Sequence, residues 1–229
     1  MRTALAIVAL SLMGVFTPVT AKKYTFTVDA FNNPEVTIRE GASFRIISTD
    51  RKTERDVAQF EAVFGYIKTI LSSMGYFETP NKRNADLIID IAFGADQPHI
   101  EFELRQSAPL SARSAAGDPT RHWPRHTYTT PHGQYYEILS SEDRIIPKTI
   151  YPKFLKITAS LNQPLDSTSP RVEAWSVTTI NQDESPDIEK YLPLLAAASI
   201  SYIGQKTNSQ KTVIIRDKSQ DVRFIRKGM

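Results

Sequence analysis

The sequence predicts an α+β protein, a two-layer α/β sandwich in which one mixed, mostly antiparallel sheet carries two helices on one face. Three observations support this fold class. Segments in which apolar and polar residues alternate recur along most of the 229-residue chain, which is typical of half-buried strands. Two other segments, one in the first third and one near the C-terminus, repeat apolar residues every three or four positions, as amphipathic helices do. Each helix has a single apolar stripe, and one shared sheet face buries both stripes.

Residues 1–21 are predicted to be a secretory signal peptide. Arg2 is the only charge, an apolar run follows over residues 4–16, and Val19-Thr20-Ala21 has small residues at the spacing that a signal peptidase recognises. The alternative is an uncleaved anchor, but the apolar run is shorter than the about 20 residues that cross a bilayer as a helix. We therefore expect residues 22–229 to form a single exported α+β domain without a transmembrane segment after cleavage.

Three strands and a long helix are predicted in the first third of the mature chain. The strands cover residues 24–31, 35–40 and 43–48, where side chains alternate between apolar and polar. The helix follows Thr53, and its apolar stripe extends from Val57 to Met74. Gly75 then stands where a left-handed residue commonly ends a helix.

The middle of the chain is predicted to consist of strands around one irregular segment. Residues 85–94 are almost continuously apolar, which favours a central strand, and residues 100–105 alternate as an amphipathic strand with one solvated face. Residues 106–124 are rich in Ser, Ala, Pro and Gly and are predicted to be a flexible loop. A hairpin with arms 125–130 and 134–139 is expected after it.

The last third is predicted to contain two long strands, a helix and two closing strands. The strands 151–161 and 171–181 continue an antiparallel meander. Ser185-Pro186-Asp187 suits a helix start, with Ser as the cap, and the helix is expected to extend to about Ile203 despite Pro193. Residues 212–216 and 222–226 are predicted to be the closing strands.

Composition excludes several classes of function. The formal net charge is only +3, and no basic cluster of the kind that binds nucleic acid is present. The chain has no cysteine, so thiol catalysis, thiolate metal sites, disulfides and lipidation of a cysteine are excluded.

The strongest candidate for a chemical site combines histidines and glutamates. His122, His126 and His132 lie close together in the sequence, and Glu101 and Glu103 lie two apart on a predicted strand. Pro124 prevents a helix from placing His122 and His126 on one face, and no nearby ligand completes a metal set. On an alternating strand the two glutamates share the face that is normally solvated. We therefore expect surface residues here, with a His/Glu-based hydrolase site as the alternative.

No other motif predicts catalysis. The chain has no G-x-S-x-G elbow, S-x-x-K motif, P-loop or dinucleotide fingerprint. Asp86 and Asp90 bracket an apolar core and are expected to end a strand or to meet a basic partner. We therefore predict no catalytic residue, no metal site and no cofactor.

Several segments resemble a known group of proteins. In GYFETPNKRNADLIIDIAFG, Gly75-Tyr76 ends a helix, a variable turn follows, and Ala85-Asp86-Leu87 begins a hydrophobic strand. The segments YPKFLKITASLN, RVEAWSVTTIN with its Trp175, and IEKYLPLLAAASISYIG follow in order. This order is similar to that of uncharacterised bacterial envelope proteins grouped as domain-of-unknown-function family 4136, over most of residues 43–216. The resemblance implies this fold and an envelope location but no catalytic residue, and the chain lacks the lipid-anchoring cysteine often found in that family.

These observations favour an exported, non-enzymatic binding or assembly module, located in the periplasm or released. The expected partners are envelope proteins or a small ligand, bound at a sheet face or edge beside residues 106–132. The alternatives are a secreted hydrolase that uses the His/Glu residues and a structural protein of a secretion or surface apparatus.

Overall fold

The computed structural model describes residues 21–47, 54–79, 84–105, 126–129, 135–138, 144–162 and 171–228. The predicted signal peptide lies almost entirely outside these residues, and the predicted loop 106–124 lies wholly outside them.

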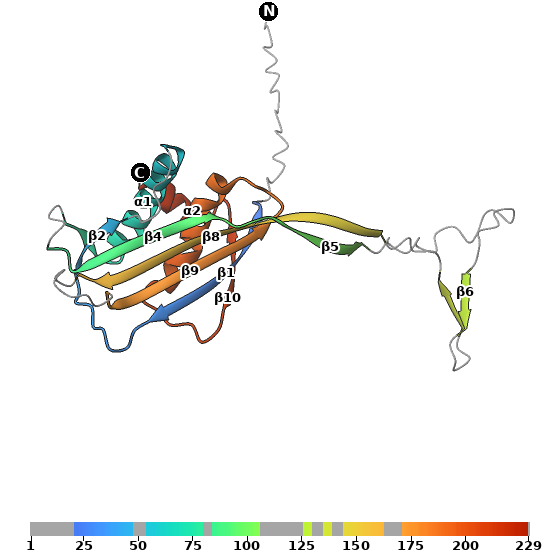
Figure 1. Cartoon of the computed structure of the whole chain (residues 1–229), viewed down its shortest axis with the longest axis horizontal. Helices are drawn as coiled ribbons and strands as arrows, with labels where there is room; N and C mark the ends of the chain where they lie inside the picture. Colours follow the sequence, from blue (N-terminus) through green and yellow to red (C-terminus); the bar gives the residue numbers. More distant parts are fainter. Residues whose placement is uncertain are drawn as a thin grey trace, which may run out of the picture.

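The described residues form an α+β fold with an eight-stranded mixed sheet, a separate two-stranded sheet and three α-helices (Figure 1). The elements are β1 (Lys23–Asn32), β2 (Ser43–Ile47), α1 (Glu54–Ser73), β3 (Phe77–Glu78), β4 (Leu87–Ala95), β5 (His99–Arg105), β6 (His126–Thr129), β7 (Tyr135–Ile138), β8 (Arg144–Leu161), β9 (Glu173–Asp183), α2 (Ile188–Ser199), η1 (Ile200–Tyr202), β10 (Lys211–Arg216) and α3 (Gln220–Lys227). The strand order in the large sheet is β10-β1-β9-β8-β4-β2-β3, and β5 pairs with β8 beside this path.

The sheet is mostly antiparallel, as the sequence predicts. Only the pairs of β2 with β3 and with β4 are parallel. β8 is the longest strand, with 18 residues, and it pairs with both β4 and β9 in the body of the sheet. Its first part, Arg144–Ile150, pairs instead with β5. Figure 1 shows β5 and this part of β8 projecting beyond the other strands, and we refer to β5 and residues 144–150 together as the arm.

The core is formed by buried residues of the sheet together with buried residues of α1, α2 and α3. In β9 alternate residues from Trp175 to Asn181 are buried, and in β1 alternate residues from Tyr24 to Ala30 are buried. α2 contacts these strands, and it also contacts α1 and α3. Every residue of α2 from Tyr191 to Ser199 is buried, as expected for a helix that is enclosed by neighbours on all sides.

The predicted C-terminus of the first helix is confirmed. Gly75 has a φ of 89°, in the left-handed region, and Tyr76 N donates to Leu71 O at 3.1 Å. This closing hydrogen bond satisfies a carbonyl that the end of the helix would otherwise leave unpaired.

The predicted strand 35–40 is wrong. Its residues form no ladder, and Asn33 begins a turn, since its side-chain Oδ1 accepts from Glu35 N at 3.0 Å. Val36 and Ile38 still pack against the core, so their alternation reflects partial burial without strand pairing.

The predicted strand 222–226 is also wrong, because these residues belong to α3. Ser219 caps the helix by accepting from Val222 N, and Val222 and Ile225, three residues apart, are the buried pair. The described residues therefore form three α-helices rather than the two predicted. A smaller correction concerns α2: its cap is Asp187, which accepts from Lys190 N at 3.3 Å, rather than Ser185.

The helical spacing of α3 predicts which of its apolar side chains stabilise the fold. Ile225→Ala removes a fully buried side chain, and we expect it to lower the free energy of unfolding by about 2–4 kcal/mol. Phe224→Ala removes a side chain that is 44% exposed, and we expect a cost of about 1 kcal/mol or less. Urea denaturation of both variants checks this order. An equal or larger loss for Phe224→Ala would contradict the helical register.

Candidate functional site

The arm presents two chemically different faces. In its register Ile100 lies opposite Thr149 and Phe102 opposite Pro147, so these side chains share one face. Ile100 is 62% exposed and Phe102 is 72% exposed, which is unusual for side chains of this size. The neighbouring positions of β5, Glu101 and Glu103, occupy the opposite face, because successive strand residues point to opposite sides.

A hollow of about 670 Å³ lies at the base of the arm, and charged side chains dominate its lining. Its lining residues are Lys22, Glu101, Phe102, Glu103, Lys148, Ile150, Gln182, Asp183 and Glu184. Four carboxylates and two ammonium groups therefore meet where the arm joins the end of β9.

Lys148 links the arm to the body of the protein. Its Nζ forms an ion pair with Glu103 of β5 and another with Glu184 Oε1, at 3.0 Å, just after β9. The hydrogen bond to Glu103, followed by that to Glu184, raises the pKa of Lys148. The other glutamate of the arm, Glu101, lies 3.2 Å from His99 Nε2.

A buried lysine lies against Tyr191 of α2 and near Asp183, which lines the hollow. Lys153 is fully buried, donates from Nζ to Tyr151 O at 2.9 Å, and lies 4.4 Å from the centre of the Tyr191 ring. Burial lowers the pKa of Lys153, and the charges of Asp183 and Asp187 oppose this shift without cancelling it.

Lys153 has polar neighbours that are also buried. Asn181 is its cross-strand partner on β9, and Asn181 Nδ2 donates to Thr25 O at 2.9 Å. Among the described residues, Asn181 Oδ1, Thr179 Oγ1 and Tyr191 Oη make no hydrogen bond of ordinary geometry. Such buried polar atoms are rare in folded proteins. Each one lowers the stability of the fold, because it has lost its hydration without gaining a hydrogen-bond partner.

Asp183 joins this buried cluster to the hollow. Its Oδ1 accepts from Ser185 N at 3.0 Å, and the residue also lines the hollow. Burial favours a higher pKa for Asp183, but the Ser185 N–H, the nearby Tyr191 hydroxyl and the charges of Lys22 and Lys153 together lower it. Burial, and then the neighbouring Asp183 carboxylate, raise the pKa of Tyr191. The Asp183 carboxylate and the Tyr191 hydroxyl are close neighbours, but their geometry is not that of a hydrogen bond.

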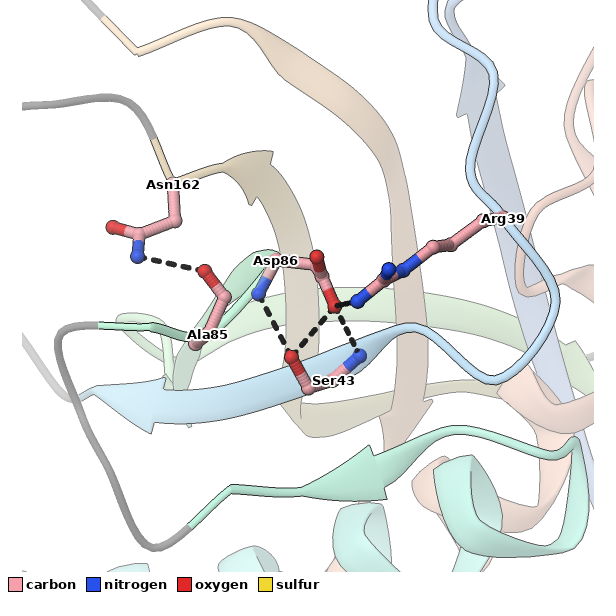
Figure 2. A network of polar contacts seen from close by, with 5 residues as sticks. All are labelled: Arg39, Ser43, Ala85, Asp86 and Asn162. Atoms are coloured by element: carbon pink, nitrogen blue, oxygen red, sulfur yellow. Dashed lines mark hydrogen bonds and ion pairs between the residues drawn. The ribbon is translucent and has the colours of Figure 1, made fainter.

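A second polar network ties β2 to β4 (Figure 2). Asp86 Oδ2 accepts from Ser43 N at 2.7 Å, from Ser43 Oγ at 2.6 Å and from Arg39 at 2.8 Å. Asp86 N donates back to Ser43 Oγ at 3.0 Å, and Asn162 Nδ2 donates to Ala85 O at 2.7 Å. The Ser43 hydroxyl, then the Ser43 N–H, lower the pKa of Asp86 to about 2. Asp86 thus meets a basic partner, as the sequence predicts, and its role is to hold two strands in register.

The structure supports only part of the predicted His/Glu combination. Glu101 and Glu103 share one exposed face of β5, but Ile100 and Phe102 on the other face are exposed too, so the predicted single solvated face is wrong, because the arm projects beyond the other strands. Glu103 forms an ion pair with Lys148, and Glu101 Oε1 lies 3.2 Å from His99 Nε2. His122 and His132 lie outside the described residues, and only the backbone of His126, in β6, is described. In the described part of the chain no three His, Cys, Asp or Glu side chains are grouped so that they could hold a metal ion.

Sequence reasoning missed the buried cluster around Lys153. One signal was present in the sequence. In β8 and β9 every second residue is buried and most of these residues are apolar, but Lys153 and Asn181 are polar residues at such positions. Recognising the pair required the register of β8 and β9, which brings residues 28 positions apart into direct opposition.

No described helix is long and apolar enough to span a membrane.

Comparison with known proteins assigns this chain to no family. No family model matches the chain, and no curated protein matches it. One similar solved structure is a PDZ domain protein from Parabacteroides distasonis, with 11% identity and a TM-score of 0.41 over 85% of this chain. The chain spans only 40% of that protein. Another is the PelC dodecamer from Paraburkholderia phytofirmans, with 11% identity and a TM-score of 0.31, covering 78% of this chain and 92% of that one. Likeness at this level carries no argument about activity or assembly.

The Asp86 network predicts an acid-dependent loss of stability. The pKa of Asp86 is lowered from 3.8 to about 2 on folding, so its stabilisation is present above pH 3.8 and is lost as pH falls through about 2. Because Asp86 is one-third exposed, we expect Asp86→Asn to cost about 1–2 kcal/mol near neutral pH, less than the full shift implies.

Urea denaturation between pH 2 and pH 7 measures this difference. It should shrink toward zero at the acid end, because the native carboxyl is then protonated as well. The matched control is Asp96→Asn, at the exposed end of β4, which should change stability little. A constant deficit for Asp86→Asn across the range would contradict the electrostatic explanation.

Lys153 predicts a rise of stability with pH in the alkaline range as well. The pKa of Lys153 is lower in the folded protein than the unfolded value of 10.5. As pH rises toward 10.5, the folded state therefore binds fewer protons than the unfolded state. The free energy of unfolding of the native protein should therefore rise with pH toward 10.5, relative to that of Lys153→Met, whose side chain is similar in length and uncharged.

The comparison is made by urea denaturation from neutral pH to about pH 10, below the range in which buried tyrosines ionise. Lys156→Met, at an exposed position of the same strand, is the control and should show no such slope. A pH-independent difference between the native protein and Lys153→Met would refute the assignment.

Proposed function

We propose that this protein is an exported, non-enzymatic binding or assembly module of the bacterial envelope, and that the arm is its contact surface. The observation that carries the proposal is the exposure of Ile100 and Phe102 side by side on one face of β5. Contiguous apolar surface on a water-exposed face is typical of interaction sites.

The backbone of the arm supports the same function. Among the described residues, β5 pairs only with β8, and residues 144–150 of β8 pair only with β5. Both edges of the arm therefore present backbone N–H and C=O groups that a further strand can bind. Charged side chains on the opposite face keep such an edge soluble while it has no partner.

The proposed envelope location rests on the sequence, and the proposed finer architecture rests on the packing of α2. Residues 1–21 have the composition of a signal peptide, and the segments around Gly75-Tyr76 and Trp175 resemble the envelope family 4136. We propose that the domain is a two-layer sandwich, because the buried faces of β1, β8 and β9 all contact α2. The ion pair of Glu103 with Lys148 and the position of Glu101 beside His99 favour a binding role over the hydrolase alternative.

A photo-crosslinking amino acid at position 102 tests the proposal. The full chain carrying this amino acid is expressed in bacteria, and the intact cells are irradiated. The protein is then purified from the envelope fraction and examined for covalent adducts by mass spectrometry. We expect one or a few specific envelope proteins to be crosslinked, because Phe102 is the most exposed large apolar side chain described.

The matched control places the same crosslinker at Phe77, which is 52% exposed on β3, far from the arm in the strand order. The same adducts at both positions, or none at 102, would count against the arm as contact surface. Ile100→Ser and Phe102→Ser should abolish co-purification of the partner while changing stability by about 0.5 kcal/mol or less.

A further inference from the structure

β5 contains a repeating chemical pattern that constrains what its free edge can bind. Its residues alternate between apolar and acidic, with Ile100 and Phe102 on one face and Glu101 and Glu103 on the other. A strand added beside β5 would follow the same alternation, because directly opposed residues of paired strands lie on the same face. Its own side chains would therefore need to be apolar on one face and complementary to carboxylates on the other.

The hollow adds acidic groups to that second face. Asp183 and Glu184 line it together with Glu101 and Glu103, and only Lys22 and Lys148 contribute positive charge to the lining. Lys148 already occupies the place that an incoming cation would take, between Glu103 and Glu184. An ammonium or guanidinium group beside it would meet the remaining carboxylate surface, where the side chain of Glu101 is 55% exposed.

We propose that β5 binds an extended segment of a partner protein in which Lys or Arg alternates with apolar residues, added as a strand at its free edge. This inference rests on the proposed function and adds the chemistry of the partner. Backbone hydrogen bonds to β5 supply affinity, and the alternation supplies specificity. The basic side chains lie over Glu101 and Glu103, and the apolar side chains cover Ile100 and Phe102.

A second copy of this chain fits the same edge poorly. Antiparallel pairing of two β5 strands around Phe102 places Glu101 opposite Glu103 of the other copy. Pairing centred on either glutamate places that glutamate opposite itself, and a shift by one residue places apolar side chains opposite carboxylates. Like charges directly opposed across strands are destabilising, so the charge pattern favours a basic partner over self-association at this edge.

A designed peptide tests the inference without knowledge of the natural partner. The probe is a fluorescent nine-residue peptide of alternating lysine and valine, and its binding to the full mature chain is followed by fluorescence anisotropy. We expect saturable binding that weakens as salt is added, because exposed charges are screened. A peptide of alternating glutamate and valine should not bind. A peptide of alternating lysine and proline, which lacks half of the backbone donors, should bind far more weakly.

Variants of the protein locate the site. The pair Glu101→Gln and Glu103→Gln should weaken binding about three- to tenfold, since each exposed ion pair contributes little by itself. The control pair Glu40→Gln and Glu61→Gln removes the same charge from exposed positions away from the arm and should have no effect. Equal weakening by both pairs, or equal binding of the lysine–proline peptide, would overturn the inference.

The outcomes separate this inference from the proposed function. If position 102 crosslinks to envelope proteins but the lysine–valine peptide does not bind, the arm remains a contact surface and the basic partner is rejected. Sedimentation that shows a dimer lost on Phe102→Ser would reject the basic partner in favour of a second copy. Binding of the peptide together with a monomeric native chain supports the inference.

Discussion

The pairing of β8 with three different strands organises the molecule. Its C-terminal part is hydrogen-bonded to β4 on one side and to β9 on the other, and its N-terminal part is hydrogen-bonded, among the described strands, only to β5. The same strand is therefore buried at one end and exposed at the other. Residues such as Leu155 and Ile157 lie in the core under the helices, whereas Pro147 and Thr149 belong to a two-stranded projection. A two-stranded ribbon is marginal by itself, and here the continuity of β8 with the sheet anchors it.

The junction between these two parts of β8 is where polar groups collect. Lys153 lies just inside the body, Lys148 lies in the arm, and Asp183 and Glu184 lie at the end of β9 beside them. Lys148 joins arm and body through ion pairs that remain partly exposed, so each contributes little stability. Lys153 is different, because its charge is buried and its few polar contacts do not replace hydration. The core thus tolerates an unfavourable ammonium group near Asp183, a residue that lines the hollow.

The network around Asp86 shows that a perturbed carboxylate need not mark a chemical site. Asp86 accepts three hydrogen bonds, from Ser43 and Arg39, and these join the starts of two parallel strands. Its lowered pKa follows from those bonds and needs no functional explanation. The arm instead presents an exposed apolar face and strand edges that no further strand among the described residues pairs with, and these are the features that recognition requires. Here the geometry of the surface is the stronger indicator of function.

Local patterns in the sequence were sufficient for the features that depend on near neighbours. The part of the α1 stripe from Phe60 to Leu71, the end of that helix at Gly75, and the alternation of β1 and β9 follow from spacing along the chain. Spacing also predicted a single solvated face for β5, but both of its faces are exposed. Local alternation failed at 35–40 and 222–226, because a strand exists only where another strand pairs with it and because Val222 and Ile225 also suit a helix. The length of β8 through Pro147, the meeting of Lys153 with Asn181 and the exposure of Phe102 depended on tertiary structure. Each of these is set by contacts between residues far apart in the chain, and only the folded register determines them.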